Sequence, residues 1–167
     1  MDAADLPGDG MVTTGTLEGV VAVASAVSDP EIPVVTIADL GILRGVAIED
    51  DVVVVTITPT YSGCPAMDVI RQDIEEAVTS AGHGPVEVRT VLAPAWTTDW
   101  ITDDGKRKLA EFGIAPPQPA TLRRGPVLCP RCQSDDTRTV SEFGSTACKA
   151  LLVCDGCGEP FDYFKEH

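Results

Sequence analysis

Two Cys-x-x-Cys pairs near the C-terminal end carry the clearest chemistry in this sequence. The pairs are Cys129-Pro-Arg-Cys132 and Cys154-Asp-Gly-Cys157, and 21 residues lie between them. Two residues between a pair of thiolates allow a tight turn that presents both sulfurs to one ion, and a hairpin between the pairs brings the second set across. This spacing predicts a tetrahedral four-cysteine metal site. Zinc is the common structural occupant of such a site, and iron is the alternative.

The same four cysteines could instead form two disulfide bonds in a secreted protein. The sequence begins Met1-Asp-Ala-Ala-Asp5, which has neither the basic region nor the apolar core of a signal peptide. We therefore favour metal binding over disulfides and expect a cytoplasmic protein.

A fifth cysteine, Cys64, directly precedes a predicted helix whose first turn contains Pro65. The free N–H groups and the positive dipole end of a helix start can lower the pKa of a thiol below its ordinary value of about 8.5. A thiolate at this position could bind a soft metal or attack an electrophile. The alternative is a small buried side chain, because free cysteine is a common core residue.

Catalysis by Cys64 would require a basic partner, and the sequence offers few. His83 lies between two glycines and His167 is the last residue, and these are the two histidines of the chain. The sequence also has no P-loop, no dinucleotide-binding glycine motif and no Gly-x-Ser-x-Gly motif. We therefore expect no catalytic turnover from this chain alone.

Hydrophobic periodicity and turn residues predict the elements that must position these cysteines. The predicted helices are 17–27, 65–81 and 103–112, and the predicted strands are 43–48, 52–58 and 86–92. Residues 1–15 are rich in Gly, Asp and Thr, which predicts disorder. Residues 113–125 are rich in proline and should form neither a helix nor a paired β-strand, so we expect a linker there. The linker divides a domain of residues 16–112 from a second domain of residues 126–167.

Charge argues against a nucleic-acid partner, and hydropathy argues against a membrane span. The net charge is -14, and residues 1–122 carry 19 acidic against 6 basic side chains. Such an acidic body repels a phosphate backbone. The sequence also lacks an apolar run long enough to span a bilayer. We therefore expect a soluble protein whose partners are other proteins.

Several short motifs surround the predicted helices and strands of the first domain. They are Asp29-Pro-Glu-Ile-Pro33, Asp39-Leu-Gly41, Thr56-Ile-Thr58 leading to Gly63-Cys-Pro65, and the tryptophan loop before the third helix. Together they resemble the MIP18-like (DUF59) domain of iron–sulfur assembly factors. Longer motifs are residues 59–67, 92–101 and 141–150 together with Pro160-Phe-Asp-Tyr-Phe164. These are similar to the D-type subunit family of the bacterial phenylacetyl-CoA epoxidase system.

The resemblance implies an α+β fold, with a small mixed sheet and helices on one side, followed by a zinc ribbon. It implies an accessory role in phenylacetate catabolism: helping to mature a multicomponent oxygenase by assembling or inserting an iron–sulfur cluster in its reductase component. Cys64 matches the reactive cysteine of the family. The residues expected to support the surrounding loops are Asp29, Glu31, Asp39 and Thr58.

The sixth cysteine, Cys148, lies between the two ribbon pairs, where it is either a packed thiol or a second residue for handling iron or a cluster. Cys64 and Cys148 together cannot fill a four-cysteine cluster site. A transient cluster would therefore need a homodimer or a partner such as the reductase to complete its ligands. Two other functions stay open: an integral epoxidase subunit that shapes the complex or couples electron transfer, and a rubredoxin-like carrier with iron in the ribbon.

Overall fold

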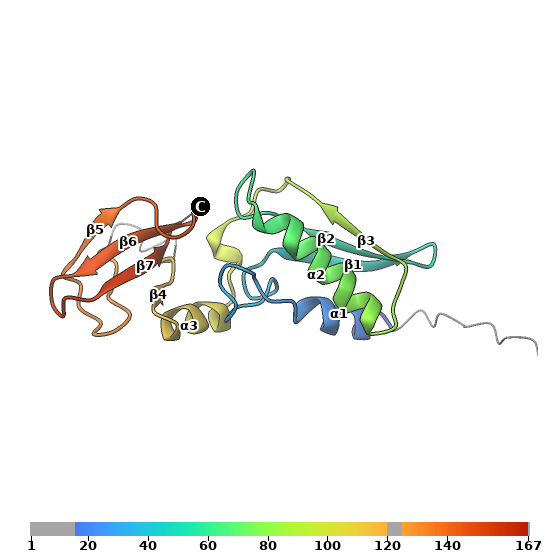
Figure 1. Ribbon diagram of the computed structural model, residues 1–167, viewed down its shortest axis with the longest axis horizontal. Helices are drawn as coiled ribbons and strands as arrows, with labels where there is room; N and C mark the ends of the chain where they lie inside the picture. The colour runs from blue at the N-terminus through green and yellow to red at the C-terminus, as the bar shows by residue number, and fades with distance from the viewer. Residues whose placement is uncertain (1–15, 120–124, 167) are drawn as a thin grey trace, which may run out of the picture.

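The computed structural model describes residues 16–119 and 125–166. They form an α+β structure with two sheets, one in each half of an elongated molecule (Figure 1). The expected disorder of residues 1–15 lies outside the described residues. The helices are α1 (Leu17–Ser25), α2 (Ala66–Ser80), the short 3-10 helix η1 (Thr98–Trp100) and α3 (Asp103–Glu111). The strands are β1 (Leu43–Glu49), β2 (Val52–Ile57), β3 (Val86–Thr90), β4 (Ile114–Ala115), β5 (Thr137–Ser141), β6 (Lys149–Cys154) and β7 (Pro160–Phe164).

The first sheet is mixed and has the order β1-β2-β3. Strands β1 and β2 form the predicted antiparallel hairpin, and Asp50 and Asp51 make its two-residue turn with φ angles of 48° and 63°. Aspartate tolerates this left-handed conformation, which fits the twist of a tight hairpin. Strand β3 pairs with β2 in parallel because the chain crosses over through α2.

Helices α1 and α2 contact each other, and they pack on the first sheet through β1 and β3. The apolar side chains of α2 recur at helical spacing, so Ile70, Ile74 and Val78 form one fully buried stripe. The hydroxyl of Thr16 accepts a hydrogen bond from the Gly19 N–H at the start of α1. The helices predicted from sequence are therefore confirmed, with ends that differ by a few residues.

The second sheet has the order β4-β7-β6-β5 and corrects one expectation about residues 113–125. Residues Ile114 and Ala115 of this predicted linker join a ladder, because they pair in parallel with Asp162 and Tyr163 of β7. They precede the prolines of the segment, so their own backbone groups remain free to pair. The chain therefore enters the ribbon sheet within a few residues of the end of α3.

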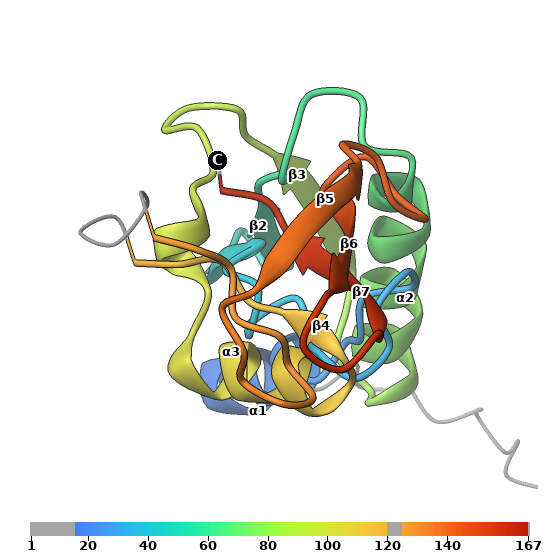
Figure 2. The same cartoon turned by 90° about the vertical axis from the view of Figure 1, so that its left-hand side faces the viewer.

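The two halves share one continuous hydrophobic contact. The buried residues Cys148 and Phe164 of the C-terminal half belong to the same cluster as the core of the first sheet. The ring of Phe164 lies 6.1 Å from that of Trp96, and the indole N–H of Trp96 donates to the Leu40 carbonyl at 2.9 Å. These contacts hold the ribbon against the first domain. Figure 2 views the molecule from the ribbon end, with the second sheet in front of the first domain. In the part of the chain described, no helix has the length and apolar character needed to cross a membrane.

Candidate metal centre and the cysteines at the domain junction

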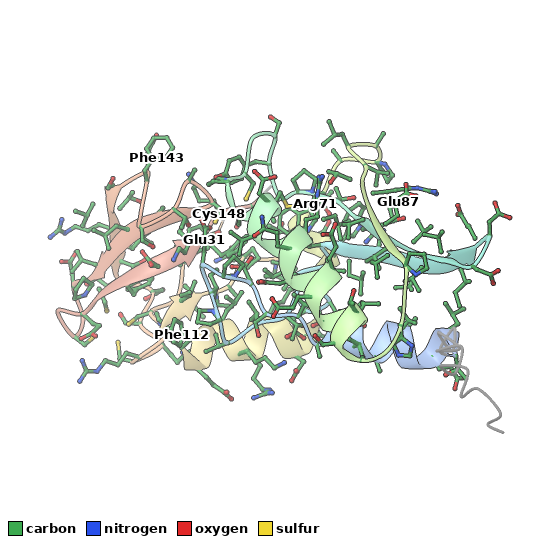
Figure 3. The ribbon with its side chains drawn as sticks, turned by 45° about the vertical axis from the view of Figure 1, so that its right-hand side comes forward. Glu31, Arg71, Glu87, Phe112, Phe143 and Cys148 are labelled. Carbon is green, nitrogen blue, oxygen red and sulfur yellow. The ribbon has the colours of Figure 1, made fainter. Side chains whose placement is uncertain are left out.

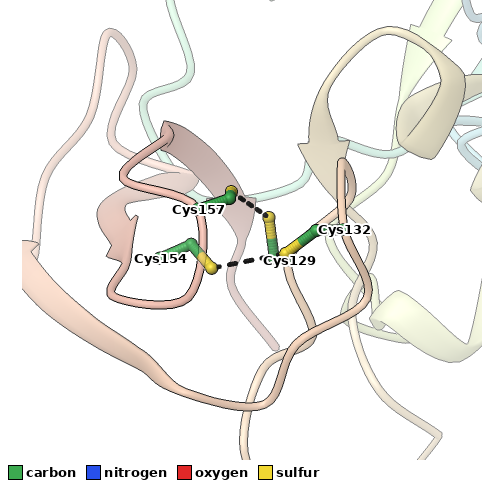
Figure 4. Close-up of side chains that lie close together, drawn as sticks. All are labelled: Cys129, Cys132, Cys154 and Cys157. Atoms are coloured by element: carbon green, nitrogen blue, oxygen red, sulfur yellow. Dashed lines mark hydrogen bonds between the residues drawn. The ribbon is translucent and has the colours of Figure 1, made fainter.

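The four ribbon cysteines come together as the sequence predicts. Their sulfur atoms all lie within 4.8 Å of one another, with Cys129 and Cys157 at 3.8 Å and Cys132 and Cys154 at 3.6 Å (Figure 4). A tetrahedral zinc ion with Zn–S bonds of about 2.3 Å places its sulfurs about 3.8 Å apart. All six cysteines are free thiols, which removes the disulfide alternative. The donor set fits a metal such as zinc.

Each ribbon pair sits in a tight turn closed by backbone hydrogen bonds. The carbonyl of Cys129 accepts from the Gln133 N–H at 2.9 Å, and the carbonyl of Cys154 accepts from the Gly158 N–H at 2.7 Å. Gln133 and Gly158 both have positive φ angles, which lets the chain turn back sharply after the second cysteine. At Gly156 a side chain would meet the Ser134 hydroxyl at 2.9 Å, so the two turns pack closely.

The pKa values of Cys129 and Cys157 are shifted in opposite directions. Burial acts to raise the pKa of Cys129, but the backbone N–H groups of Cys132 and Arg131 outweigh it and lower that pKa to about 7. The N–H of Glu159 acts to lower the pKa of Cys157, whereas burial and the neighbouring thiols raise it to about 12. Adjacent thiolates repel one another, and a bound cation would remove that repulsion.

Cys64 lies at the end of the loop that joins β2 to α2, and its side chain is half-buried. The expected fall in its pKa is wrong. Burial raises the pKa of the Cys64 thiol, and the carboxylates of Glu31 and Asp29 add to the rise. The Ala66 N–H at the helix start and the Tyr61 hydroxyl act in the opposite direction without reversing it. The helix start is present, but desolvation and two nearby carboxylates outweigh it.

Cys148 immediately precedes β6 and is buried, with 5% of its surface exposed. Its sulfur lies 3.0 Å from the Thr146 hydroxyl, and burial followed by the carboxylate of Glu31 raises the pKa of its thiol. The Tyr61 hydroxyl interacts electrostatically with Cys64, Cys148 and Glu31. Cys148 and Glu31 lie close together where the ribbon meets the first domain (Figure 3). The structure therefore brings the two non-ribbon cysteines into one neighbourhood.

Asp29 and Asp39 have the geometry expected of loop-supporting residues. The Asp29 carboxylate accepts hydrogen bonds from the N–H groups of Glu31 and Ile32 at 2.9 and 2.8 Å. The Asp39 carboxylate accepts from the Thr36 N–H at 3.0 Å and from the Lys108 ammonium at 2.8 Å. Asp29 thus shapes the loop after α1, and Asp39 ties the next turn to α3.

Glu31 and Thr58 do not make the expected loop hydrogen bonds with their side chains. Within residues 16–119 and 125–166, no hydrogen bond to the Glu31 carboxylate is found, and this carboxylate instead interacts electrostatically with both thiols. The Thr58 hydroxyl is buried and has no hydrogen-bond partner among the described residues. We therefore place Glu31 with the cysteines and leave Thr58 as a buried residue at the end of β2.

Two residues of the junction were not predicted from the sequence. Lys149 is buried, pairs with Asp162 at 3.2 Å and also interacts electrostatically with Asp29, Glu31 and Cys148. A lysine that directly precedes the apolar run 150–153 was the available signal, because a buried charge requires a partner. Tyr61, whose hydroxyl interacts electrostatically with Cys64, lies within the family-like motif of residues 59–67, but that motif gave no sign of this role.

Comparison with known proteins gives the same two parts. Residues 17–91 match the family described as iron-sulfur cluster assembly protein, and residues 114–165 match the PaaD zinc beta ribbon domain. A crystal structure titled as a domain of unknown function DUF59 from Bacillus anthracis is 28% identical. It covers 56% of this chain and 90% of its own, with a TM-score of 0.52. The fold and the cysteine cluster thus define an assembly-type domain followed by a zinc ribbon.

Two relatives identify the family. A relative from Escherichia coli K12, the D-type subunit of a "Putative 1,2-phenylacetyl-CoA epoxidase", is 52% identical over 147 residues, which span 86% of this chain and 89% of the relative. An "Fe-S protein maturation auxiliary factor" of Porphyromonas gingivalis is 35% identical over 96 residues, which span 56% of this chain and 90% of that protein. The chain belongs to the family of the D-type subunits of phenylacetyl-CoA epoxidase.

Proposed function

We propose that this protein is an accessory factor for the maturation of a phenylacetyl-CoA epoxidase and that it helps to assemble or insert the iron–sulfur cluster of the reductase component. The position of Cys64 carries the proposal. Its half-buried thiol stands at the start of α2, in a domain that matches the iron–sulfur assembly family. A thiol in this position can ligate iron or a cluster edge during transfer, because thiolates are preferred ligands of both.

The two sets of cysteines have separate roles in this proposal. Cys129, Cys132, Cys154 and Cys157 hold one structural zinc ion and maintain the ribbon. A closed four-thiolate site leaves no position open for a substrate, so it suits folding and docking rather than transfer. Cys64 handles the cargo, which is iron or an iron–sulfur unit. The two sets lie in different domains, which we divide near residues 113–125. Strand β4 belongs to the ribbon sheet.

The decisive experiment measures the reductase rather than this protein. Cells that lack the gene should make the epoxidase polypeptides, fail to grow on phenylacetate and contain a reductase deficient in iron and acid-labile sulfide. A plasmid encoding the wild-type chain should restore the cluster, whereas the Cys64→Ser variant should not. A fully loaded reductase in the gene-deleted cells would disprove the maturation role.

A second measurement separates this role from that of an integral component of the complex. Purified epoxidase whose reductase already contains its cluster should turn over at the same rate with and without this protein. A strict stoichiometric requirement in that assay would instead support an integral component. An iron-loaded ribbon would absorb visible light, as a rubredoxin-like carrier does, whereas a zinc-loaded ribbon is colourless.

A further inference from the structure

We propose that Cys64, Cys148 and Glu31 together bind one thiophilic divalent metal ion, with Fe(II) as the physiological cargo, across the contact between the two domains. This inference extends the proposed function by giving its transfer site a second thiol and a carboxylate. It depends on the maturation role for the identity of the cargo, and the existence of the site is tested separately.

The location of Cys148 is the first argument. The ribbon has its own hydrophobic cluster, which contains Cys129, Cys154 and the apolar side chains of β6 and β7. Cys148 does not belong to it and lies instead in the cluster of the first domain, against which Cys64 and Tyr61 pack. One thiol of the ribbon therefore lies outside the ribbon core and packs in the core of the first domain. A merely packed cysteine would serve equally well inside the ribbon.

Glu31 provides the second argument. The side chain of Asp29 holds the loop by accepting the Glu31 and Ile32 N–H groups, so the position of the Glu31 backbone is fixed. The Glu31 carboxylate is half-buried and accepts no hydrogen bond within the described ranges. It interacts electrostatically with both thiols. Lys149 also interacts electrostatically with this carboxylate, but it donates no hydrogen bond to it among the described residues. The carboxylate oxygens therefore remain available as ligands, and two thiols lie in the same neighbourhood.

The charge balance of the junction also favours a cation. Five groups that are neutral or negative meet there, and the local positive charge is that of Lys149. These five groups are Asp29, Glu31, Tyr61, Cys64 and Cys148. Lys149 pairs with Asp162 of the ribbon and interacts electrostatically with Asp29, Glu31 and Cys148, so one positive charge is shared among four groups. A divalent ion would neutralise the two thiolates that it creates, because its binding displaces one proton from each thiol.

The number and type of ligands suit the transfer of a metal ion better than its permanent binding. Two thiolates and a carboxylate can bind Fe(II), Zn(II) or Co(II), and three protein ligands leave one tetrahedral position for an incoming donor. In the described chain, only the four ribbon cysteines have ligand atoms that all lie within 4.8 Å of one another. Rotation of the junction side chains must therefore accompany binding. The bound ion would also tie the ribbon to the first domain.

The site can be tested with Co(II) as a spectroscopic probe on the full chain. The protein is purified with zinc in the ribbon, kept reduced without oxygen and titrated with Co(II), while zinc content is followed by metal analysis. We expect one cobalt ion beyond the zinc, with a thiolate-to-cobalt charge-transfer band. Cys64→Ser and Cys148→Ser should each remove about half of that band and weaken binding by at least about tenfold. Glu31→Gln should weaken binding while it preserves the band, and Glu75→Gln, an exposed carboxylate of α2, should match the wild type.

The possible results separate this site from the maturation role. Failure of the wild-type protein to bind a second ion, or a Cys148→Ser variant with wild-type affinity and band, would overturn the shared site. If Cys64→Ser alone removes the band, Cys64 binds without Cys148, and the maturation role survives. If the site binds cobalt but the reductase of gene-deleted cells is fully loaded, the maturation role fails and the site stands. Glu31→Gln leaves both thiols in place, so it tests the site even if a cysteine variant misfolds.

Discussion

The thiol of Cys148 from the ribbon and the thiol of Cys64 from the first domain belong to one neighbourhood, and the Tyr61 hydroxyl interacts electrostatically with both. These cysteines are 84 positions apart in the sequence and lie on opposite sides of the contact between the two domains. Any change that undocks the ribbon would therefore separate them. We therefore expect a metal ion in the ribbon to influence the surroundings of Cys64 through the packing of the two halves.

Removal of the ribbon metal should undock the ribbon while the first domain stays folded. Four thiolates hold the two turns of the ribbon together, so its fold should depend on the ion. Trp96 packs against Phe164 of β7 and reports docking by its fluorescence. In a Trp100→Phe background, a chelator should release one zinc ion and shift the Trp96 emission to the red. The helical circular dichroism should be largely retained.

Serine at Cys129 should reproduce the effect of the chelator, whereas Cys64→Ser should retain zinc and the emission of the wild type. Unchanged Trp96 emission after complete zinc release would show that the metal does not control docking.

Alkylation should distinguish the two junction cysteines. Cys64 is half-buried and Cys148 is buried, so Cys64 should react faster in the zinc-loaded protein. Burial and nearby carboxylates raise the pKa of both thiols above the ordinary value for cysteine, which favours the unreactive protonated form at neutral pH. The rate at Cys64 should therefore be below that of an exposed cysteine peptide at pH 7 and should still be rising above pH 9. Mass spectrometry of the labelled peptides measures both rates.

A rate at Cys64 that levels off below pH 8 would contradict this prediction. It would show that the helix start dominates, as the sequence pattern alone suggested.

Features that depend on local spacing could be predicted from the sequence alone. The two Cys-x-x-Cys pairs, the hairpin with Asp50 and Asp51 at its turn and the apolar stripe of α2 are each contained in a short segment. The remaining features depend on contacts between segments that are distant in the sequence, so they could not be predicted from it. The pKa of Cys64 depends on Glu31 and Asp29, which a different loop brings near.

Strand β4 was missed for a related reason. Its two residues have no pattern of their own, and they become a strand because β7 offers an edge for pairing. The shared location of Cys64 and Cys148 likewise depends on how the ribbon docks, and no periodicity in either segment encodes that contact.

Truncation of the Phe164 ring should destabilise the contact between the halves. This side chain is 1% exposed and joins the core of the first domain, so Phe164→Ala should lower the free energy of unfolding by about 3–5 kcal/mol. Phe143 is the matched control, because 66% of its surface is exposed. Its replacement by alanine should change stability by about 1 kcal/mol or less, the cost of its contact with Lys165. Urea unfolding monitored by circular dichroism gives both values, and equal losses would refute the packing argument.

The ion pair of Asp39 and Lys108 should make part of the stability depend on pH. Burial acts to raise the pKa of Asp39, but hydrogen bonds from Lys108 and Thr36 outweigh it and hold that pKa below its ordinary value of 3.8. A carboxylate whose pKa is lower in the folded than in the unfolded state stabilises the fold above the unfolded value. This contribution is lost as the pH falls through the folded value. Asp39→Asn should therefore lower the urea midpoint at pH 7, and its difference from the wild type should shrink below pH 3.8.

Lys108→Met removes the cation and leaves the Asp39 turn with the Thr36 N–H intact. It should lower the midpoint at pH 7 less than Asp39→Ala, which removes both hydrogen bonds. Because the carboxylate and the ammonium act as a pair, the effect of Lys108→Met should be much smaller in the Asp39→Asn background than in the wild type. A difference between Asp39→Asn and the wild type that stays constant from pH 7 to pH 3 would show that ionisation of Asp39 does not stabilise the fold. In that case the carboxylate would act through the shape of the turn alone.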